Sequence, residues 1–291
     1  MSAFAAAPCS ERRRSGIAST ALRGEALGRH SWFGAVVVVL ALVPAGRVGA
    51  EVFTVPDSIR QLSAPKEEFH VLRAPEGAVL GEQHFQAVVT GDRLAFDIMT
   101  RFTSGEEWDE HGEMDLAHGF RSRLFQKTVR RAGRVSEEQH VDFTTGKITW
   151  LVDGVQAERT MSFTPDTYIG PMMALVLAGV PEKSPAASSF QALVFRPDPA
   201  VFTLRAESID QEDFKAGKRV EPTTKLRVKA DLGPVKNVMF ASLIPTHYFW
   251  FTRQSPPEFL AFEGKLGNGV EVVMVPETPT TKTAYSQTLP R

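Results

Sequence analysis

Apolar and polar residues alternate with a period of two along most of the chain after residue 78. Leu94, Phe96 and Ile98 are apolar, whereas Asp97 and Arg101 fall on the intervening side. Such alternation is typical of a strand with one buried face and one wet face. The pattern predicts a sheet rather than a helical body.

Turn signals divide this region into short strands. Thr144–Gly146 and Asp153–Gly154 carry residues that suit tight turns, and alternating residues flank both. Connections this short favour antiparallel hairpins, because parallel strands need a crossover of a dozen or more residues. The predicted strands lie near residues 133–143, 147–153, 155–163, 190–196, 201–209, 223–233, 258–265 and 270–275.

One segment, about 168–179, breaks the alternation and predicts a helix. Pro171 suits a first helical turn, and Gly179 suits a C-terminal cap. The segment is apolar on all sides, so we expect the helix to be buried against the concave face of the sheet. The predicted fold class is mainly β: a strongly curved antiparallel sheet or incomplete barrel with one buried central helix.

The ends of the chain differ from this β-rich region, which we place at 78–276. Residues 51–77 contain Pro56, Pro65 and Pro75 and predict an extended N-terminal arm with little regular structure. Residues 277–291 are rich in Thr and Pro and predict a flexible tail.

Residues 1–50 have the pattern of an export signal. Arginines precede an apolar run at Trp32–Ala45, and the small residues of Val48–Ala50 follow. The run is shorter than the roughly 20 residues of a spanning helix. We therefore predict a signal peptide cleaved near Ala50, and a periplasmic or secreted protein. An uncleaved N-terminal anchor is the alternative.

Composition excludes several functional classes. The chain has 291 residues with 33 Lys and Arg against 34 Asp and Glu, so it is no general nucleic-acid binder. Setting aside six Arg and two Glu in 1–50 leaves 27 basic and 32 acidic residues. Cys9 is the single cysteine, so residues 51–291 hold no thiol nucleophile, disulfide or thiolate metal site.

An aromatic stretch, Pro245–Phe251, suggests an apolar binding site. Aromatic rings beside a Met-rich buried helix could line a hollow that takes a lipid-like ligand. An ordinary core strand explains the same residues. The predicted ligand-binding residues are Met172, Met173, Leu175, Tyr248, Trp250 and Phe251.

Polar clusters suggest weaker alternatives. If 106–115 is a strand, alternate acidic residues and His111 share one face, and Asp109, His111 and Glu113 are the candidate metal ligands. A solvated outer strand explains these charges equally, and we expect no cofactor. The basic row Lys225, Arg227 and Lys229, with Arg205 and Lys236 nearby, could meet an anionic headgroup or glycan, or could be a wet strand face.

The familiar catalytic and nucleotide-binding motifs are absent from the sequence. It contains no Gly-x-Ser-x-Gly elbow, dinucleotide fingerprint or phosphate loop. A site assembled from distant strands stays open as an alternative, and a hydrolase using His118, His140 and Asp142 is one such hypothesis.

Three motifs carry a resemblance to a known family. They are Trp150–Gly154, His247–Trp250 and Phe259–Gly264, arranged around one apolar helix behind an export signal. This arrangement resembles the bacterial envelope family called domain of unknown function 3108, over about residues 78–276. The resemblance implies a periplasmic β shell around a helix, in outline like the half-barrels of lipoprotein carriers, that could capture an apolar ligand. The acidic 106–115 strand and the long leader depart from that pattern, and the family has no established catalytic residues.

The sequence thus favours an exported, non-catalytic protein that binds an apolar or lipid-like ligand in a β-sheet hollow. The alternative is a structural or interaction module of a cell-envelope assembly, with a protein partner held at an exposed strand edge or by the 51–77 arm. The volume of the space between helix and sheet discriminates between these two hypotheses. An apolar void above roughly 300 Å³ favours the ligand hypothesis, and a filled interior favours the interaction module.

Overall fold

The computed structural model describes one β-rich unit of the chain. The described residues are 63–73, 77–180, 187–195, 198–216, 219–231, 245–254, 257–266 and 269–276, with Phe53, Val55 and Ile59. The chain divides into two compact units, Met1–Gly46 and Arg47–Arg291, and every described residue lies in the second. The predicted leader over 1–50 and the predicted tail over 277–291 lie outside the described residues. No described helix is long and apolar enough to cross a membrane.

Within the described residues, fifteen strands join into one sheet. They are β1 (Ser63–Arg73), β2 (Val79–Thr90), β3 (Arg93–Phe102), β4 (Glu106–Asp115), β5 (Arg121–Arg131), β6 (Arg134–Asp142), β7 (Lys147–Val152), β8 (Val155–Thr160), β9 (Thr167–Ile169), β10 (Ala187–Phe195), β11 (Pro199–Ala216), β12 (Arg219–Ala230), β13 (Thr246–Thr252), β14 (Phe259–Lys265) and β15 (Glu271–Pro276). The hairpins predicted around Thr144–Gly146 and Asp153–Gly154 are confirmed as β6–β7 and β7–β8. Asp153 and Gly154 have φ angles of 50° and 82°, as a two-residue turn of this kind requires.

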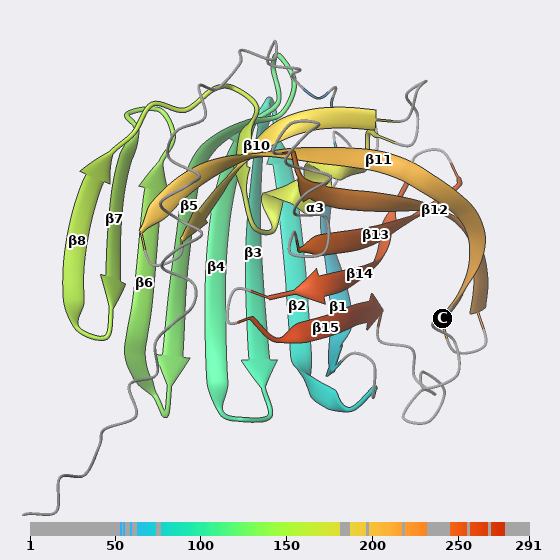
Figure 1. Ribbon diagram of the computed structural model, residues 1–291, viewed down its shortest axis with the longest axis horizontal. Helices are drawn as coiled ribbons and strands as arrows, with labels where there is room; N and C mark the ends of the chain where they lie inside the picture. The colour runs from blue at the N-terminus through green and yellow to red at the C-terminus, as the bar shows by residue number, and fades with distance from the viewer. Residues whose placement is uncertain are drawn as a thin grey trace, which may run out of the picture. The chain divides into compact units, whose positions relative to one another are not determined.

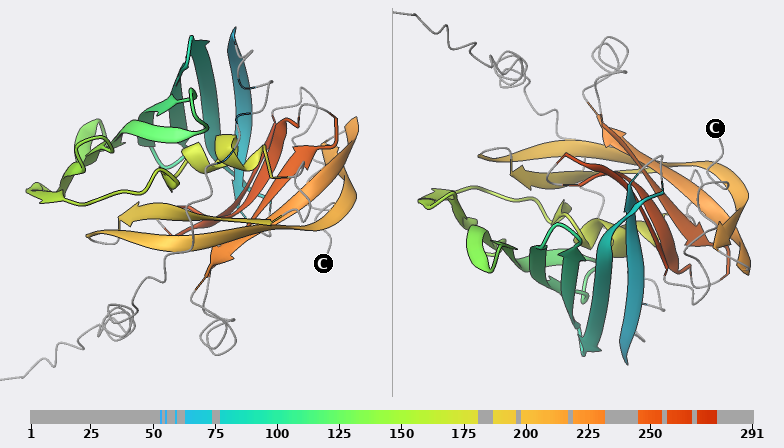
Figure 2. Two further views of the ribbon diagram at one scale, coloured as in Figure 1. Left: turned by 90° about the horizontal axis from the view of Figure 1, so that it is seen from above. Right: turned by 90° about the horizontal axis from the view of Figure 1, so that it is seen from below.

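The sheet is open and doubles back on itself. Its strand order runs from β8 through β1 and β15 to β9, so β8 and β9 are its two edges (Figure 1). Neighbours pair antiparallel except β9 and β10, which are parallel. Figure 2 shows β3–β8 on one side and β10–β15 on the other, with helix α3 (Met172–Leu177) between them. The predicted fold class, a curved antiparallel sheet around one buried helix, is confirmed.

The helix is buried as expected but is shorter than predicted. Residues 167–169 form β9 and pair with Gln191–Leu193 of β10, so the strand takes up the start of the predicted 168–179 helix. Gly170, at φ 40°, turns the chain from β9 into α3. Ala178 is the C-cap of the helix in place of the predicted Gly179, and Gly179 does not have the positive φ that is common in a glycine after a helix.

Residues 63–73 correct the prediction of an irregular arm over 51–77. They form β1, which lies in the middle of the sheet between β2 and β15. Pro65 is tolerated because the pairing register with β2 shifts between Ser63 and Lys66, and such irregularities accommodate a residue without an N–H. Pro65 therefore marks an interrupted strand rather than the absence of one.

Alternation across the strands gives the sheet two different faces. We call the face that packs against α3 the inner face and the opposite one the outer face. In β3, Leu94, Phe96 and Ile98 are buried on the inner face, in the same apolar cluster as Met172 and Val176 of α3. Burial at this scale supplies most of the stability of a domain.

Tyr168 is one of the large side chains packed in the interior. Its side chain is fully buried, its hydroxyl donates to the carbonyl oxygen of Phe120 at 3.0 Å, and its ring meets those of Phe53 and Phe190. Burial raises the pKa of Tyr168 well above its ordinary value. Tyr168, Phe53 and Phe190 thus fill the part of the interior in which they lie.

Candidate functional site

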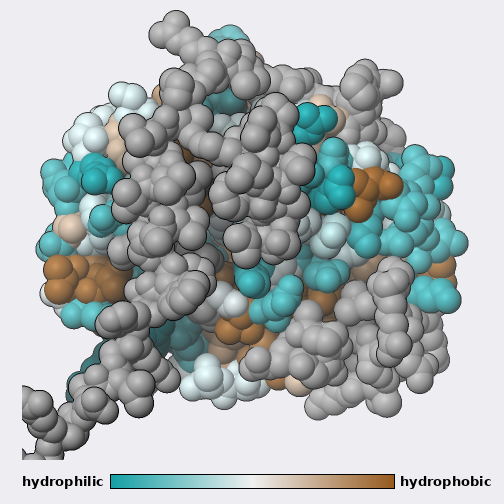
Figure 3. Space-filling view, viewed as in Figure 1, coloured by the Kyte–Doolittle hydropathy of each residue, from teal (hydrophilic) through white to brown (hydrophobic). Residues whose placement is uncertain are grey.

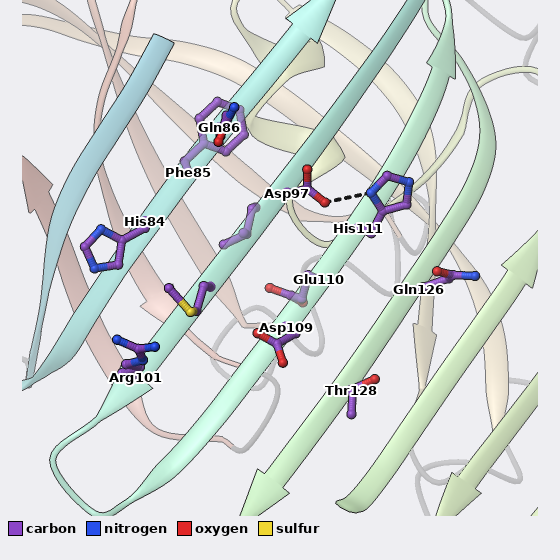
Figure 4. Close-up of a pocket in the computed structure, with 12 residues that line it drawn as sticks. His84, Phe85, Gln86, Asp97, Arg101, Asp109, Glu110, His111, Gln126 and Thr128 are labelled. Carbon is purple, nitrogen blue, oxygen red and sulfur yellow. Dashed lines mark hydrogen bonds and ion pairs between the residues drawn. The ribbon is translucent and has the colours of Figure 1, made fainter. Parts of the chain in front are cut away.

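A polar groove crosses the outer face of β2, β3, β4 and β5. Its volume is about 580 Å³, within the usual range of ligand sites. The lining residues are His84, Phe85, Gln86, Asp97, Ile98, Met99, Arg101, Asp109, Glu110, His111, Gln126 and Thr128. Figure 4 shows most of the labelled polar side chains standing on the same side of these four strands.

Strand pairing brings the groove residues together. Asp97 of β3 lies opposite Gln86 of β2 on one side and opposite His111 of β4 on the other. His111 in turn lies opposite Gln126 of β5. Directly paired residues of an antiparallel sheet project from the same face, about 5 Å apart. The groove is therefore built from one row of side chains across the strands and its neighbouring rows.

Asp97 and His111 form the centre of the groove. His111 Nδ1 lies 2.8 Å from Asp97 Oδ1 (Figure 4). His111 Nε2 lies 3.8 Å from Glu113 Oε1. The Asp97 side chain is nevertheless 73% exposed and that of His111 34% exposed. This pair is held in place by its own hydrogen bond yet remains accessible to a ligand.

Charges at one end of the groove are balanced. Arg130 of β5 forms an ion pair with Asp109, and the Arg101 Nε lies 3.7 Å from the Glu107 carboxylate. These side chains are between 37% and 60% exposed, so each pair contributes little to stability. The two ion pairs place hydrogen-bond donors and acceptors at this end of the groove without adding a strong net charge.

The amide row continues beyond the groove. Gln126 Nε2 lies 3.0 Å from His140 Nδ1 on β6, and His140 is paired with Thr149 of β7. Polar side chains therefore follow one another from Gln86 on β2 to Thr149 on β7. A ligand longer than the groove could form hydrogen bonds with the polar side chains along this row.

Gly112 lets the inner face close tightly behind His111. A Cβ atom at Gly112 would lie 2.2 Å from the Phe96 ring, which is fully buried. The glycine therefore allows Phe96 to pack directly on the backbone of β4. This packing supports the strand that carries both His111 and Glu113.

The predicted metal ligands share a face but form no metal site. Asp109, His111 and Glu113 lie on the outer face, as the alternation predicted. Asp109 is engaged by Arg130, and His111 is held between two carboxylates. Among the residues that the structure describes, no three His, Cys, Asp or Glu side chains are arranged to hold a metal ion.

The six predicted ligand-binding residues lie on both faces of the sheet. Met172, Leu175 and Phe251 are buried in the inner-face cluster, and Met173 packs against it. Trp250 belongs to a second cluster, against which Tyr248 packs. Because neighbouring residues of a strand point to opposite faces, Trp250 and Phe251 cannot line one hollow.

Trp250 is the centre of a closed polar cluster on the outer face. We call Glu212, Phe214, Lys225, Tyr248 and Trp250 the Trp250 cluster. Trp250 Nε1 donates to Glu212 Oε1 at 2.6 Å, the Phe214 ring centre lies 5.6 Å from that of Trp250, and Trp250 is 1% exposed. Lys225 Nζ lies 4.7 Å from the Trp250 ring centre and 4.9 Å from that of Tyr248.

A carboxyl group beside the Trp250 cluster is also partly shielded. Burial raises the pKa of Glu263, and Lys225 opposes that rise. Glu263 is paired with Tyr248 across β13 and β14. The polar groups here are therefore engaged by each other rather than presented to solvent.

The predicted basic row is neutralised within the sheet. Arg227 Nε donates to Glu207 at 2.9 Å, and Lys225 Nζ lies 3.7 Å from Glu212. Burial alone would raise the pKa of Glu207, but the Arg227 guanidinium and the other nearby cations outweigh it and lower that pKa. This supports a wet strand face, and Lys236 lies outside the described residues.

The candidate hydrolase residues have separate partners. His118 is exposed, His140 contacts Gln126, and Asp142 accepts hydrogen bonds from Thr144 and Thr145 in the following turn. The Thr144 hydroxyl and these other donors lower the pKa of Asp142 to about 2. Asp142 thus holds a turn rather than orienting His140.

The sequence contains only part of a signal for the groove. The acidic strand was recognisable, but His84, Gln86 and Asp97 are isolated polar residues at alternate positions of ordinary strands. Gln126 and Thr128 are equally ordinary. The signal that could have found them is the register of the predicted hairpins, which sets these positions side by side.

Comparisons with known proteins give distant matches in fold only. No protein-family model matches the chain, so membership of the family of domain of unknown function 3108 is not shown. No curated protein matches either.

Three solved structures match the chain with low TM-scores. A β-barrel-like protein from Brucella abortus, of domain of unknown function 1849, matches with a TM-score of 0.46 at 9% identity, over 73% of this chain and 95% of that one. A Pseudomonas aeruginosa protein of domain of unknown function 1089 matches with a TM-score of 0.27 at 13% identity, over 65% and 86%. A Bacteroides fragilis protein with a YmcC-like fold, provisionally classed as exported, matches with a TM-score of 0.27 at 10% identity, over 78% and 98%.

Proposed function

We propose that this chain is an exported, non-catalytic binding protein whose outer-face groove holds a hydroxyl-rich ligand, such as an oligosaccharide of the cell envelope. The observation that carries the proposal is the groove of about 580 Å³ around the accessible pair Asp97 and His111. The leader pattern of residues 1–50 supports export.

The lining chemistry favours a neutral, hydrogen-bonding ligand. Carboxylates at Asp97 and Asp109 accept hydrogen bonds, Arg101 donates them, and the amides of Gln86 and Gln126 do both. A sugar hydroxyl is also both donor and acceptor, so a glycan can satisfy each of these groups. An apolar ligand would bury them without partners, at a cost of about 1–3 kcal/mol for each.

The arrangement around His111 supports binding rather than catalysis. An Asp–His pair resembles part of a hydrolytic triad, in which the second ring nitrogen faces a nucleophile. Here that nitrogen, Nε2, faces the carboxylate of Glu113 at 3.8 Å. A carboxylate at this position stabilises the imidazole in its orientation but supplies no hydroxyl or thiol to activate.

The hypothesis of an apolar ligand between helix and sheet stays a prediction. Met172 and Phe251 are fully buried, and Trp250 lies on the other face. A lipid at this position would have to displace core side chains. The burial of Met172 and Phe251 therefore gives more support to a site on a surface of the sheet than to one inside it.

Binding to immobilised bacterial envelope oligosaccharides tests the proposal. We expect Asp97→Ala to weaken binding about ten- to a hundredfold, because a charge-assisted hydrogen bond contributes about 1.5–3 kcal/mol. Asp213→Ala is the matched control, since Asp213 is an exposed carboxylate on β11 outside the groove.

Two results would contradict the proposal. One is the absence of binding to any peptidoglycan-derived or lipopolysaccharide-derived oligosaccharide in the panel. The other is equal binding by the Asp97→Ala and Asp213→Ala variants. Displacement of a hydrophobic dye by lipid, weakened by Phe251→Ala, would favour the apolar ligand instead.

A further inference from the structure

The two edge strands of the sheet, β8 and β9, differ in length, exposure and contacts. β9 is three residues long and buried, and it is covered by β5: the Ser122 hydroxyl donates to the Thr167 carbonyl oxygen at 2.8 Å. β8 is six residues long, almost fully exposed, and paired only with β7 among the described strands (Figure 1). An edge of this kind offers unpaired backbone groups to another strand.

The geometry of the β7–β8 hairpin shows which backbone groups face outward. Val152 and Val155 flank the two-residue turn, and the amide of Met161 bonds to the carbonyl oxygen of Gly146. Odd-numbered residues of β8 therefore direct their N–H and C=O groups towards β7. Gln156, Glu158 and Thr160 direct theirs away from the sheet.

Nothing within β8 blocks this edge. The strand has no proline, and its pairing with β7 has no register shift. Its two charged side chains are engaged within the chain: Glu158 lies 3.0 Å from Lys147 Nζ, and Arg159 Nη1 donates to the Pro199 carbonyl oxygen at 3.2 Å. Proline and a β-bulge, two of the devices that usually protect an edge, are thus absent from β8.

Exposed apolar side chains accompany the edge. Val155 is 71% exposed, and Val135 and Val152 on the two neighbouring strands are 44% and 40% exposed. In the space-filling view an apolar patch lies at the left margin, where β7 and β8 are placed in Figure 1 (Figure 3). A second strand added to β8 would cover part of this surface.

We propose that β8 pairs antiparallel with β8 of a second copy of this chain, centred on Ala157. The outward-facing residues must pair with each other, and a two-fold axis through the Ala157 pair sets Gln156 of each copy opposite Glu158 of the other. Both backbone groups of Gln156 and of Glu158 then take part in the new ladder. Val155 lies opposite the aliphatic part of Arg159.

Charge selects this register over its neighbours. A shift of the axis to Glu158 would place two like carboxylates opposite each other, which is unfavourable. A shift to Gln156 would leave Glu158 opposite the turn residue Gly154 and lose ladder bonds. The register centred on Ala157 avoids both costs, so β8 is complementary to itself.

The dimer is closed and weak. A two-fold interface uses the same surface on both copies and does not propagate into fibres. Six residues on each side bury less area than the roughly 1,200 Å² of a stable complex, so we expect dissociation constants in the micromolar range or weaker. The outer faces, with their two grooves, would form one continuous surface.

Sedimentation equilibrium of the purified protein, at concentrations from about 10 µM to about 1 mM, measures the association. We expect Gln156→Lys to strengthen the dimer about fivefold, because the new ammonium group of each copy lies opposite Glu158 of the other. Gln156→Glu should weaken it by a similar factor, because two pairs of like charges form. Gln156→Pro should abolish it by removing an outward N–H that is not bonded to β7.

The matched controls are Gln211→Lys and Gln211→Glu on β11, at an exposed glutamine away from the edge. These should leave the association unchanged, and circular dichroism should show all variants folded. A protein that is monomeric throughout the concentration range overturns the proposal. So does a dimer that responds equally to the Lys and Glu variants of Gln156, since its contact then lies elsewhere.

Discussion

The groove and the Trp250 cluster lie on the same face of the same sheet, and both combine carboxylates, a cation and ring side chains. In the groove the central carboxylate, Asp97, is 73% exposed. In the Trp250 cluster the tryptophan is 1% exposed, and Lys225 lies against two rings. The residue types are alike, but their accessibility is opposite.

The difference comes from what covers each region. Phe214, at the far end of the long strand β11, packs on Trp250, and Glu212 accepts its indole N–H. Asp97 and His111 are not covered in this way by the described residues, since their side chains are 73% and 34% exposed. A polar cluster stabilises the fold where aromatic groups close over it, and is available for binding where they do not.

The largest effect should follow from removing the centre of the closed region. We expect Trp250→Ala to lower the free energy of unfolding by about 3–5 kcal/mol, because it removes a fully buried ring and leaves Glu212 without its donor. Trp250→Phe keeps most of the packing and should cost about 1–2 kcal/mol. Urea denaturation measures both.

The same truncation in the groove should behave differently. Asp97→Ala should change the free energy of unfolding by less than about 0.5 kcal/mol, because surface substitutions of this kind rarely do more. A Trp250→Ala protein as stable as the Asp97→Ala protein would remove the distinction between the two regions.

Gly112 tests whether the open region depends on the packing behind it. Gly112→Ala should cost about 1–3 kcal/mol, because the new methyl group meets the buried Phe96 ring. The double variant Gly112→Ala, Phe96→Leu should recover part of that loss by making room. If thermal unfolding shows the single variant to be as stable as the native protein, the strand has space that the structure does not show.

The smallest effect concerns Asp142, an outer-face carboxylate that is satisfied by its own turn. Its folded pKa of about 2 lies below the ordinary 3.8, so its stabilising contribution is complete above about pH 4 and is lost as the pH falls through 2. Asp142→Ala should therefore cost less than about 1 kcal/mol at pH 7, given the solvent screening, and almost nothing near pH 2. Unfolding curves of both proteins at the two pH values measure this. A cost that grows on acidification would contradict the assignment.

Local patterns were sufficient for most of the sheet. The hairpins of β6, β7 and β8 follow from alternation and from Asp153–Gly154, which depend on residues close in sequence. β1 was missed because Pro65 interrupts its pattern, and only pairing with β2 and β15 makes it a strand. β9 was missed because the three residues Thr167–Ile169, directly before an apolar helix, are too few to show a period of their own.

The candidate site could not be predicted from the sequence of any single strand. Tyr248, Trp250 and Phe251 belong to a run that is aromatic at every position, so the sequence alone hides which face each ring occupies. Their pairing with Arg227, Lys225 and Thr224 reveals it. The groove depends further on the curvature of β2–β5, which is a property of the sheet and not of any one strand.

The seam between β1 and β15 joins the beginning of the sheet to its end. Phe69 pairs with Pro276, so the ladder between β1 and β15 cannot form until the chain has been synthesised past residue 276. Contacts between such distant residues make folding slow, because the chain must close a long loop before gaining them. Until then, β1 of a nascent chain has no β15 partner. Removal of β15 would leave β1 and β14 as two new unpaired edge strands.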